Sequence, residues 1–481
     1  MPFILPANTL SAGGYDVANS CIFDRASTDS MSKSMSDGSS IKGTFSAWIK
    51  VDGTGNEMNI LSHFQDTSNV FSIATSGSSV YVVDYNSGYS LQLATNRIMR
   101  DPSAWFHLYV AIDRSQATAD NRNRIFINGV EETSFSNRTN YSQQTSGGHQ
   151  DAISMNDGQC TMYLGGLGDG NQMFGGYLAE LHWIDGTVPA VTEFGEFDED
   201  SGIWKPKLVS GISYGTNGFY LDFQDASNLG NDANGGTDLT ESNIASTNQS
   251  TDTCTNNHAT FNPLGNYFPA TVFSEGNLKG TFNSSNYSFN NSTIGVSAGR
   301  WYFETKIITT ATDNQSLIGI SDRDSVGTTD ELGSGAYQYG FYGGTQGTPN
   351  PQGKIRTNDG YSDYSDVTYT DDDIIGTYVD LEDNKIYFSK NGTLLNSGTG
   401  FSITAPASTD TGFYFLSVGS YSGSNSPVYE VNFGSPSFAL ADTAIADDNG
   451  YGAFEYSPNI TGDSTAKSFY TLNTKNLAEF G

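Results

Sequence analysis

The stretch that decides the fold is DIIGTYVDLEDNKIYFSKNG, residues 373–392. Its first half alternates apolar residues with polar or small ones, which is the period of a β-strand with one buried face. An Asp-Asn pair at 383–384 interrupts the alternation, and residues 385–389 resume it. Asn-Gly at 391–392 tolerates the positive φ angles of a tight turn. The stretch therefore predicts a β-hairpin followed by a second turn.

Composition narrows the class of protein. A chain of 481 residues is too long for one core, so two or three domains are expected. Its 22 basic and 53 acidic residues give a formal charge of −31, which repels phosphate backbones and argues against nucleic-acid binding. An aromatic content of 13% is typical of a folded chain rather than a disordered one. No apolar stretch is long enough to span a bilayer, so no membrane insertion is expected.

The hairpin at 373–392 resembles the signature hairpin of the SPRY domain, and further SPRY landmarks stand in order around it. They are GRWYFETKI (299–307), IGISD (318–322), YGFYGG (339–344), GFYFLSVGSYSG (412–423) and YEVNFG (429–434). The resemblance implies a β-sandwich over residues 266–440 that serves as a binding module and has no catalytic residues. Trp301 and Phe388 lie on alternating runs and are expected in its core.

The first part of the chain carries four more alternating runs. They are GTFSAWIKV (43–51), AWFHLYVAID (104–113), RIFINGVEE (124–132) and GGYLAELHWIDG (175–186). In this order they resemble the strands of a concanavalin A-like or laminin-G-type jelly roll. That resemblance implies a fold that most often binds carbohydrate, although many such domains bind protein.

We therefore predict an all-β protein with two antiparallel β-sandwiches. The expected parts are an N-terminal arm (1–19), a jelly roll (20–193), an irregular bridge (194–265), a SPRY-like sandwich (266–440) and a C-terminal tail (441–481).

Segments between and beyond the two sandwiches resemble a type of structural protein encoded by marine bacteriophages. They include GIWKPK (202–207), YGTNGFYLDF (214–223) and TKNLAEFG (474–481). The resemblance implies a tail-fibre-like protein of the virion surface, made in the host cytoplasm. Such a protein attaches to host-surface glycan or protein and contacts other virion proteins. A homo-oligomer is expected, and because heptads are absent a trimer would not rest on a coiled coil.

Two other functions stay open at this point. The chain could be a capsid decoration or tail-adaptor protein that binds only other virion proteins. It could also be a glycan depolymerase, although we expect no enzyme activity.

Recognition is predicted in a tyrosine-rich segment, residues 335–372. Tyrosine offers a large contact area at low entropic cost, and Gly, Ser and Asn provide adaptable hydrogen bonds, as in antibody paratopes. Tyr339 and Tyr342 are expected to cover the sheet, whereas the run DGYSDYSD (359–366) looks too polar for a core. The predicted contact residues are Asp359, Tyr361, Asp363, Tyr364 and Tyr369.

A calcium site is predicted in GNDANGGTD, residues 230–238, where Asp232, Asn234 and Asp238 offer hard oxygen ligands. The loop is similar to acidic loops of laminin-G-type chains. An ordinary polar turn is the alternative interpretation.

Two motifs suggest catalysis, but neither is expected in the local structure that catalysis requires. GISYG (211–215) matches the nucleophile motif at Ser213, yet no following helix is expected. Glu196, Asp198 and Asp200 alternate like the carboxylates of some jelly-roll glycosidases, but the flanking Gly and Ser residues favour a solvated loop.

Overall fold

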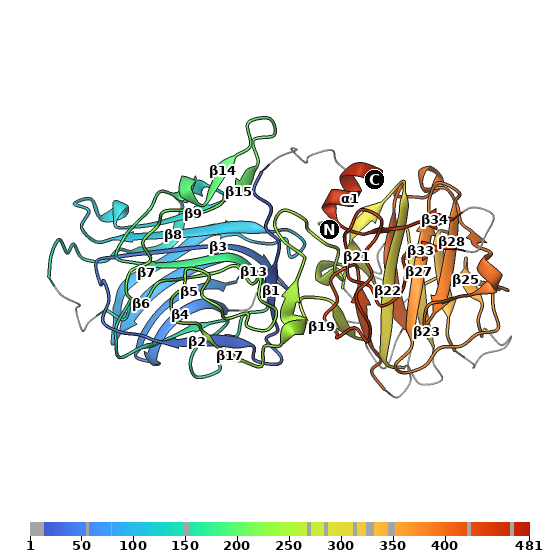
Figure 1. The fold of residues 1–481 in the computed structure, drawn as a ribbon, viewed down its shortest axis with the longest axis horizontal. Coiled ribbons are helices and arrows are strands. Elements are labelled where there is room, and N and C mark those ends of the chain that lie inside the picture. The colour runs from blue at the N-terminus through green and yellow to red at the C-terminus, as the bar shows by residue number, and fades with distance from the viewer. Residues whose placement is uncertain are drawn as a thin grey trace. The chain divides into compact units, whose positions relative to one another are not determined.

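The computed structural model describes residues 14–53, 57–77, 79–147, 153–266, 271–282, 287–310, 315–323, 331–344, 352–420, 425–461 and 466–481. The chain divides into two compact units, called here the N-terminal unit (residues 14–255) and the C-terminal unit (residues 256–481). Residues 1–13 of the expected arm lie outside the described residues. Figure 1 shows that each unit consists mainly of β-strands.

The N-terminal unit contains two large antiparallel sheets. The first follows the order β10 (Val130–Glu131), β9 (Asn123–Ile127), β8 (Phe106–Asp113), β3 (Lys42–Val51), β13 (Gly176–Asp185), β1 (Ser20–Phe23) and β18 (Gln249–Ser250), and β16 (Phe219–Leu221) also pairs with β13. The second follows the order β11 (Phe135–Thr139), β7 (Tyr89–Ile98), β6 (Ser79–Asn86), β5 (Asn69–Ser76), β4 (Met58–Asp66), β12 (Thr161–Leu164), β2 (Ser30–Ser34) and β17 (Thr240–Ser242).

One hydrophobic core joins these two sheets. Phe45 of β3 pairs with Val110 of β8, and both side chains are buried in the same cluster as Phe71 of β5 and Leu91 of β7. Alternate residues of each strand enter this cluster, because successive side chains of a strand point to opposite faces. The alternation seen in the sequence therefore corresponds to a sandwich core.

The segment expected to form a bridge, residues 194–265, is divided between the units at residue 255. Its β16, β17 and β18 add to the sheets of the N-terminal unit. A separate hairpin joins β14 (Gly195–Phe197) to β15 (Trp204–Pro206). Short 3-10 helices at Ala119–Asn121, Val191–Glu193 and Ser246–Asn248 complete the unit as described.

The C-terminal unit is also built on two sheets. One follows the order β19 (Val272–Ser274), β20 (Lys279–Thr281), β32 (Val428–Asn432), β22 (Arg300–Thr309), β27 (Ile374–Asp380), β28 (Lys385–Lys390) and β29 (Thr393–Leu394), with β30 (Phe401–Ser402) on β28 and β35 (Tyr470–Thr471) on β22. The other follows the order β21 (Ser288–Val296), β31 (Tyr414–Ser420), β23 (Ser316–Ser321), β24 (Gln338–Tyr342), β25 (Ile355–Thr357) and β26 (Gly360–Ser362). All the described strand pairs of these two sheets are antiparallel except that of β22 with β35.

The predicted hairpin at 373–392 is confirmed as β27 and β28. Thr377 pairs with Phe388 in the ladder, and Asn391 and Gly392 adopt φ angles of 47° and 75° in the turn that follows. Trp301 and Phe388 are fully buried, as predicted. The ring of Phe388 stacks on Phe341 of the other sheet with centroids 5.0 Å apart, so the hairpin contributes one of the contacts between the two layers.

The C-terminal tail is part of its unit rather than a free extension. β35 pairs parallel with β22, and the buried Glu304 of β22 accepts hydrogen bonds from the backbone N–H groups of Glu455 and Tyr456. Phe454 and Phe469 pack on the outer face of the sheet. The remaining elements are β33 (Asn459–Ile460), β34 (Lys467–Ser468), α1 (Thr474–Phe480) and 3-10 helices at Pro263–Gly265, Asn396–Gly398 and Pro406–Ser408.

The predicted fold class is confirmed: the protein is nearly all-β, with α1 as the single α-helix of the ranges given above. None of the described helices is long and apolar enough to cross a membrane.

Candidate ligand-binding surfaces

Three of the predicted contact residues lie at the surface of the C-terminal unit. Asp359 and Asp363 are exposed and Tyr361 is half-buried. Asn358 and Asp359 both have positive φ, which matches the tight turn that joins β25 to β26. Residues 345–351 of the same tyrosine-rich segment lie outside the described residues.

Arg356 of β25 contacts two of these side chains, Asp359 and Tyr361. Its guanidinium lies 3.0 Å from Glu331 and 3.1 Å from Asp359, and it donates a hydrogen bond of 3.0 Å to the Tyr361 hydroxyl. Its central carbon also lies 5.2 Å from the centre of the Tyr361 ring, at cation–π distance. We call Arg356, Asp359, Tyr361 and Asp363 the Arg356 surface. Neither Arg356 nor Glu331 was predicted, because a lone Arg or Glu in a polar stretch carries no sequence signal.

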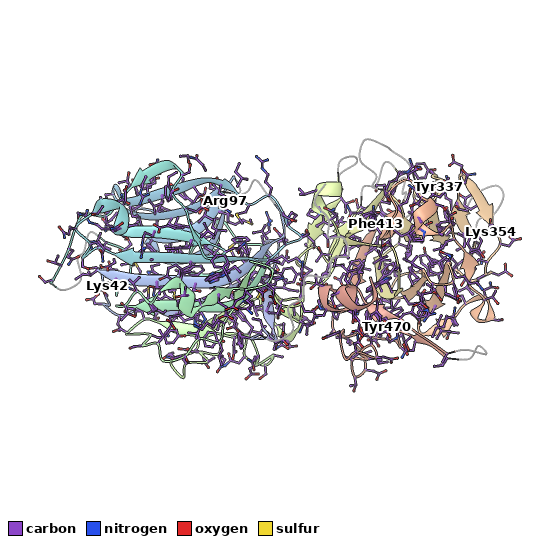
Figure 2. The ribbon with its side chains drawn as sticks, turned by 90° about the horizontal axis from the view of Figure 1, so that it is seen from above. Lys42, Arg97, Tyr337, Lys354, Phe413 and Tyr470 are labelled. Carbon is purple, nitrogen blue, oxygen red and sulfur yellow. The ribbon has the colours of Figure 1, made fainter. Side chains whose placement is uncertain are left out.

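Two neighbouring residues, Tyr342 and Lys354, hold the Arg356 surface in place. The Tyr361 ring packs edge-on against Tyr342, with centroids 5.8 Å apart, and Tyr342 belongs to a buried cluster. Burial raises the pKa of Tyr361, so its hydroxyl stays protonated. At the other end of the surface Lys354 forms an ion pair with the exposed Asp363, and Figure 2 shows Lys354 at the margin of the unit. The surface thus presents one anchored aromatic ring among charged groups.

The expectation that Tyr364 and Tyr369 face outward is wrong, because both are buried. The Tyr364 ring packs edge-on against Phe388, and its hydroxyl accepts a hydrogen bond from the Phe388 backbone N–H. The Tyr369 hydroxyl lies within hydrogen-bonding distance of the carbonyl oxygens of Ser316 and Phe341. Their polar neighbours in sequence follow the surface while these two side chains turn inward and find polar partners for their hydroxyls.

The predicted calcium loop is held by its own hydrogen bonds. Asp232 is buried, and its Oδ1 accepts from the backbone N–H groups of Tyr220 and Asn234. Asp238 accepts from the Asp232 backbone N–H and from the side-chain amide of Asn228. Both carboxylates also act electrostatically on Lys33, so an ammonium group already neighbours the loop.

A calcium ion would find few free ligands in this loop. Oδ2 of Asp232 is buried next to Gly236. It has no hydrogen-bond partner within the described part of the chain. Calcium needs six to eight oxygens, and the other carboxylate oxygens of Asp232 and Asp238 already accept N–H groups. Among the residues that the structure covers, no group of three or more His, Cys, Asp or Glu side chains is placed to hold a metal. The hydrogen bonds of the loop are those of a polar turn, and calcium binding by Asp232, Asn234 and Asp238 stays a prediction.

The two sequence motifs that suggested catalysis lie in loop-like positions. Ser213 is exposed in an irregular segment that leads through a turn into β16, with no helix after it. Asp198 caps the turn between β14 and β15, where it accepts from the backbone N–H groups of Asp200 and Ser201. Glu196 and Asp200 are exposed on the same hairpin.

A buried Ser–His contact in the N-terminal unit also resembles catalytic machinery. Ser46 Oγ lies 2.8 Å from Nε2 of His107, and the indole N–H of Trp204 donates to Nδ1 of His107. Because the indole is only a donor, Nδ1 of His107 carries no proton and Nε2 must donate to Ser46. Burial lowers the pKa of His107 to about 3, which keeps the ring neutral. Ser46 and His107 therefore do not form a nucleophile–base pair.

Two protein-family models match this chain, one in each unit. Residues 300–425 match the family model of the SPRY domain, and residues 25–190 match that of the concanavalin A-like lectin/glucanases superfamily. The chain carries one domain of each kind. The two matched ranges each lie inside one unit, so each unit corresponds to one domain type. The comparison with curated protein sequences gives no match.

Solved structures are similar at low sequence identity. The SPRY domain of human HERC1 is 17% identical, with a TM-score of 0.29, over 36% of this chain and 96% of that chain. Another human SPRY domain is 16% identical, with a TM-score of 0.24, over 32% of this chain and 90% of that chain. A Bacteroides ovatus protein proposed to bind carbohydrate is 14% identical, with a TM-score of 0.31, over 47% of this chain and 58% of that chain. Since these scores are low, the family models identify the domains.

Proposed function

We propose that this chain is a non-catalytic adhesion protein of a bacteriophage virion surface, and that its β-sandwiches bind host-surface glycan or protein. The binding part of the proposal is supported by the two domain families, one of which is named for lectins as well as glucanases. The phage part rests on the resemblance of segments outside both matched ranges, such as residues 202–207 and 474–481. The virion-surface protein would act as a homo-oligomer, which light scattering can test.

The observation that carries the binding proposal is the Arg356 surface. Arg356, Asp359 and Tyr361 meet at one turn, where the ion pairs of Arg356 with Asp359 and Glu331 and the packing of the Tyr361 ring hold them before any partner arrives. Asp363 lies beside them and pairs with Lys354. Preorganised side chains bind more tightly because less conformational freedom is lost on association. Tyrosine and arginine are also the residue types that most often dominate binding energy at interfaces.

The test is attachment of the purified protein to host cells and to arrayed host glycans. The double variant Tyr361→Ala, Asp363→Ala should weaken attachment by roughly tenfold or more, because one lost anchor of about 1.4 kcal/mol corresponds to a factor of ten. Tyr364 is unsuitable for this test because it supports the core. Tyr361→Phe keeps the ring and removes only the hydrogen bond to Arg356, so it separates ring contact from hydroxyl contact.

Tyr89→Ala is the matched control, since Tyr89 is an exposed tyrosine of the N-terminal unit. Unchanged attachment of the double variant, with melting also unchanged, would remove the Arg356 surface from the proposal. A wild-type protein that binds no host material but joins purified virions would favour the decoration or tail-adaptor alternative. Release of reducing sugar from host glycan would favour the depolymerase.

A further inference from the structure

A pocket of about 350 Å³ lies in the C-terminal unit, in a region that the sequence did not single out. It is placed between β28, the loop that follows β29, and β33 of the C-terminal tail. This volume falls in the range of small-molecule sites in proteins. The residues that line it are Lys385, Tyr387, Leu394, Ser397, Gly398, Thr399, Gly400, Ile460 and Thr461.

The loop that forms one wall has a specific backbone. Asn396, Ser397 and Gly398 adopt φ angles of 51°, 52° and 78° in succession, a left-handed run that non-glycine residues seldom adopt. Backbone hydrogen bonds from Gly398 to Leu395 and from Thr399 to Asn396 close the turn. The wall is therefore a closed turn rather than an extended segment.

Gly400 brings this loop directly onto the floor of the pocket. A Cβ atom at Gly400 would lie 2.6 Å from the ring of Tyr387, so only glycine lets the backbone approach so closely. Tyr387 and Ile460 belong to the buried cluster under the tail, and Leu394 packs against it. The pocket thus has an apolar floor supplied by the sheet and the tail.

The rim of the pocket is polar. Ser397, Thr399 and Thr461 are exposed lining residues, and a hydroxyl group can both donate and accept hydrogen bonds. Lys385 contributes an ammonium group, which only donates. An apolar floor with a hydroxyl and ammonium rim matches a pyranose ring, whose C–H face is apolar and whose edge carries oxygen acceptors.

Lys385 also provides a positive charge, which acts electrostatically on the nearby Asp383 without forming an ion pair with it. Asp380 pairs with Arg300 and Lys467, and Asp383 pairs with Lys467 at 2.6 Å. Among the described residues, no ion pair within 4.0 Å involves Lys385. A charge-assisted hydrogen bond from Lys385 to a ligand carboxylate is therefore possible without breaking an existing ion pair.

We propose that this pocket binds one acidic pyranose unit of a polysaccharide, with the sugar carboxylate on Lys385 and the sugar hydroxyls on the Ser397, Thr399 and Thr461 side chains. The inference deepens the proposed function by adding a second, chemically defined site, and it rests on that function only in treating the chain as a glycan binder. The Arg356 surface takes no part in it.

The test compares sodium glucuronate with methyl glucoside by calorimetric titration and by saturation-transfer NMR on the full chain. Wild-type protein should bind glucuronate about tenfold more tightly than the glucoside, and added salt should narrow the difference. Lys385→Gln should weaken glucuronate binding about tenfold while the glucoside affinity stays the same. Thr399→Val should weaken the binding of both sugars.

Lys207→Gln, at an exposed lysine of the N-terminal unit, is the matched control and should change neither affinity. Equal affinity of the wild-type protein for the two sugars, no detectable binding of either, or unchanged glucuronate affinity in Lys385→Gln would each overturn the proposal. Those results would leave attachment through the Arg356 surface untouched, so failure of the two proposals can be told apart.

Discussion

The ammonium group of Lys50 lies 2.7 Å from the carboxylate of Asp252, although the two residues are 202 positions apart in the sequence. Both side chains are almost completely buried. The indole N–H of Trp105 donates to the other oxygen of Asp252, so each oxygen of the buried carboxylate has a partner. The pair ties the end of the N-terminal unit to the central strand β3.

Removing one partner of this pair should destabilise the N-terminal unit strongly. Lys50→Met leaves the Asp252 charge buried without its counter-ion, which costs about 3–5 kcal/mol. Denaturant unfolding measures the change. The double variant Lys50→Met, Asp252→Asn should recover most of the loss, because it removes the unpaired charge and keeps an acceptor for Trp105.

Lys42 provides the control for this prediction. Lys42 also lies in β3 and forms an ion pair with Asp113 at 3.8 Å, at the protein surface. It is labelled in Figure 2. Lys42→Met should cost less than about 1 kcal/mol, since exposed pairs contribute little. Equal effects of Lys50→Met and Lys42→Met would contradict the argument that burial makes the Lys50 pair important.

Phe388→Ala should destabilise the C-terminal unit by about 3–5 kcal/mol. The ring is fully buried between the two sheets, where it contacts Phe341 and Tyr364, and its removal leaves a cavity. Thermal unfolding measures the loss. Phe197→Ala, at a phenylalanine with 49% of its surface exposed, is the matched control and should change the melting temperature little. A Phe388→Ala protein that melts like the wild type would mean that the two layers do not meet at this ring.

Stability of the N-terminal unit should depend on pH through Glu180. Burial raises the pKa of Glu180 to about 7, although hydrogen bonds from Tyr220 and Tyr15 act in the opposite direction. The folded state therefore binds a proton more tightly than the unfolded chain. Glu180 contributes this stability fully below the ordinary glutamate pKa, and the contribution is lost as pH rises through about 7.

The measurement is the melting temperature from pH 5 to pH 8 in the wild type and in Glu180→Gln. The amide can accept from one tyrosine and donate to the other, so the variant keeps the local hydrogen bonds. The variant should lose less stability than the wild type as pH rises. Asp84, whose pKa burial raises to about 6, is present in both proteins and cancels in the comparison. Parallel pH profiles would show that Glu180 stays charged throughout.

The calcium prediction has a direct test. If the loop with Asp232, Asn234 and Asp238 holds calcium, a chelator should lower the melting temperature and added calcium should restore it, because a ligand that binds only the folded state stabilises it. Asp232→Asn should abolish that response. A melting temperature that does not respond to chelator would assign the three residues to the hydrogen-bonded turn seen here.

Alternation and turn chemistry predicted the strands and turns, whereas the two sandwiches were implied by the resemblance of these runs to SPRY and concanavalin A-like domains. The run at 373–392, the positions of Trp301 and Phe388 and the all-β class follow from local patterns, since side-chain period and turn residues act within a few positions. The Arg356 surface was predicted only in part. Its Asp359, Tyr361 and Asp363 are close in sequence, whereas Glu331 reaches Arg356 only after the strands have paired.

What the sequence by itself determined is therefore where strands and turns occur, together with the types of domain they build. The tertiary structure decided which tyrosines face solvent. Tyr364 and Tyr369 stand in a polar stretch, yet Phe341, Phe388 and the carbonyl group of Ser316 come from other strands and give these rings an apolar site with partners for their hydroxyls. Burial depends on neighbours that are distant in sequence, and local composition does not contain them.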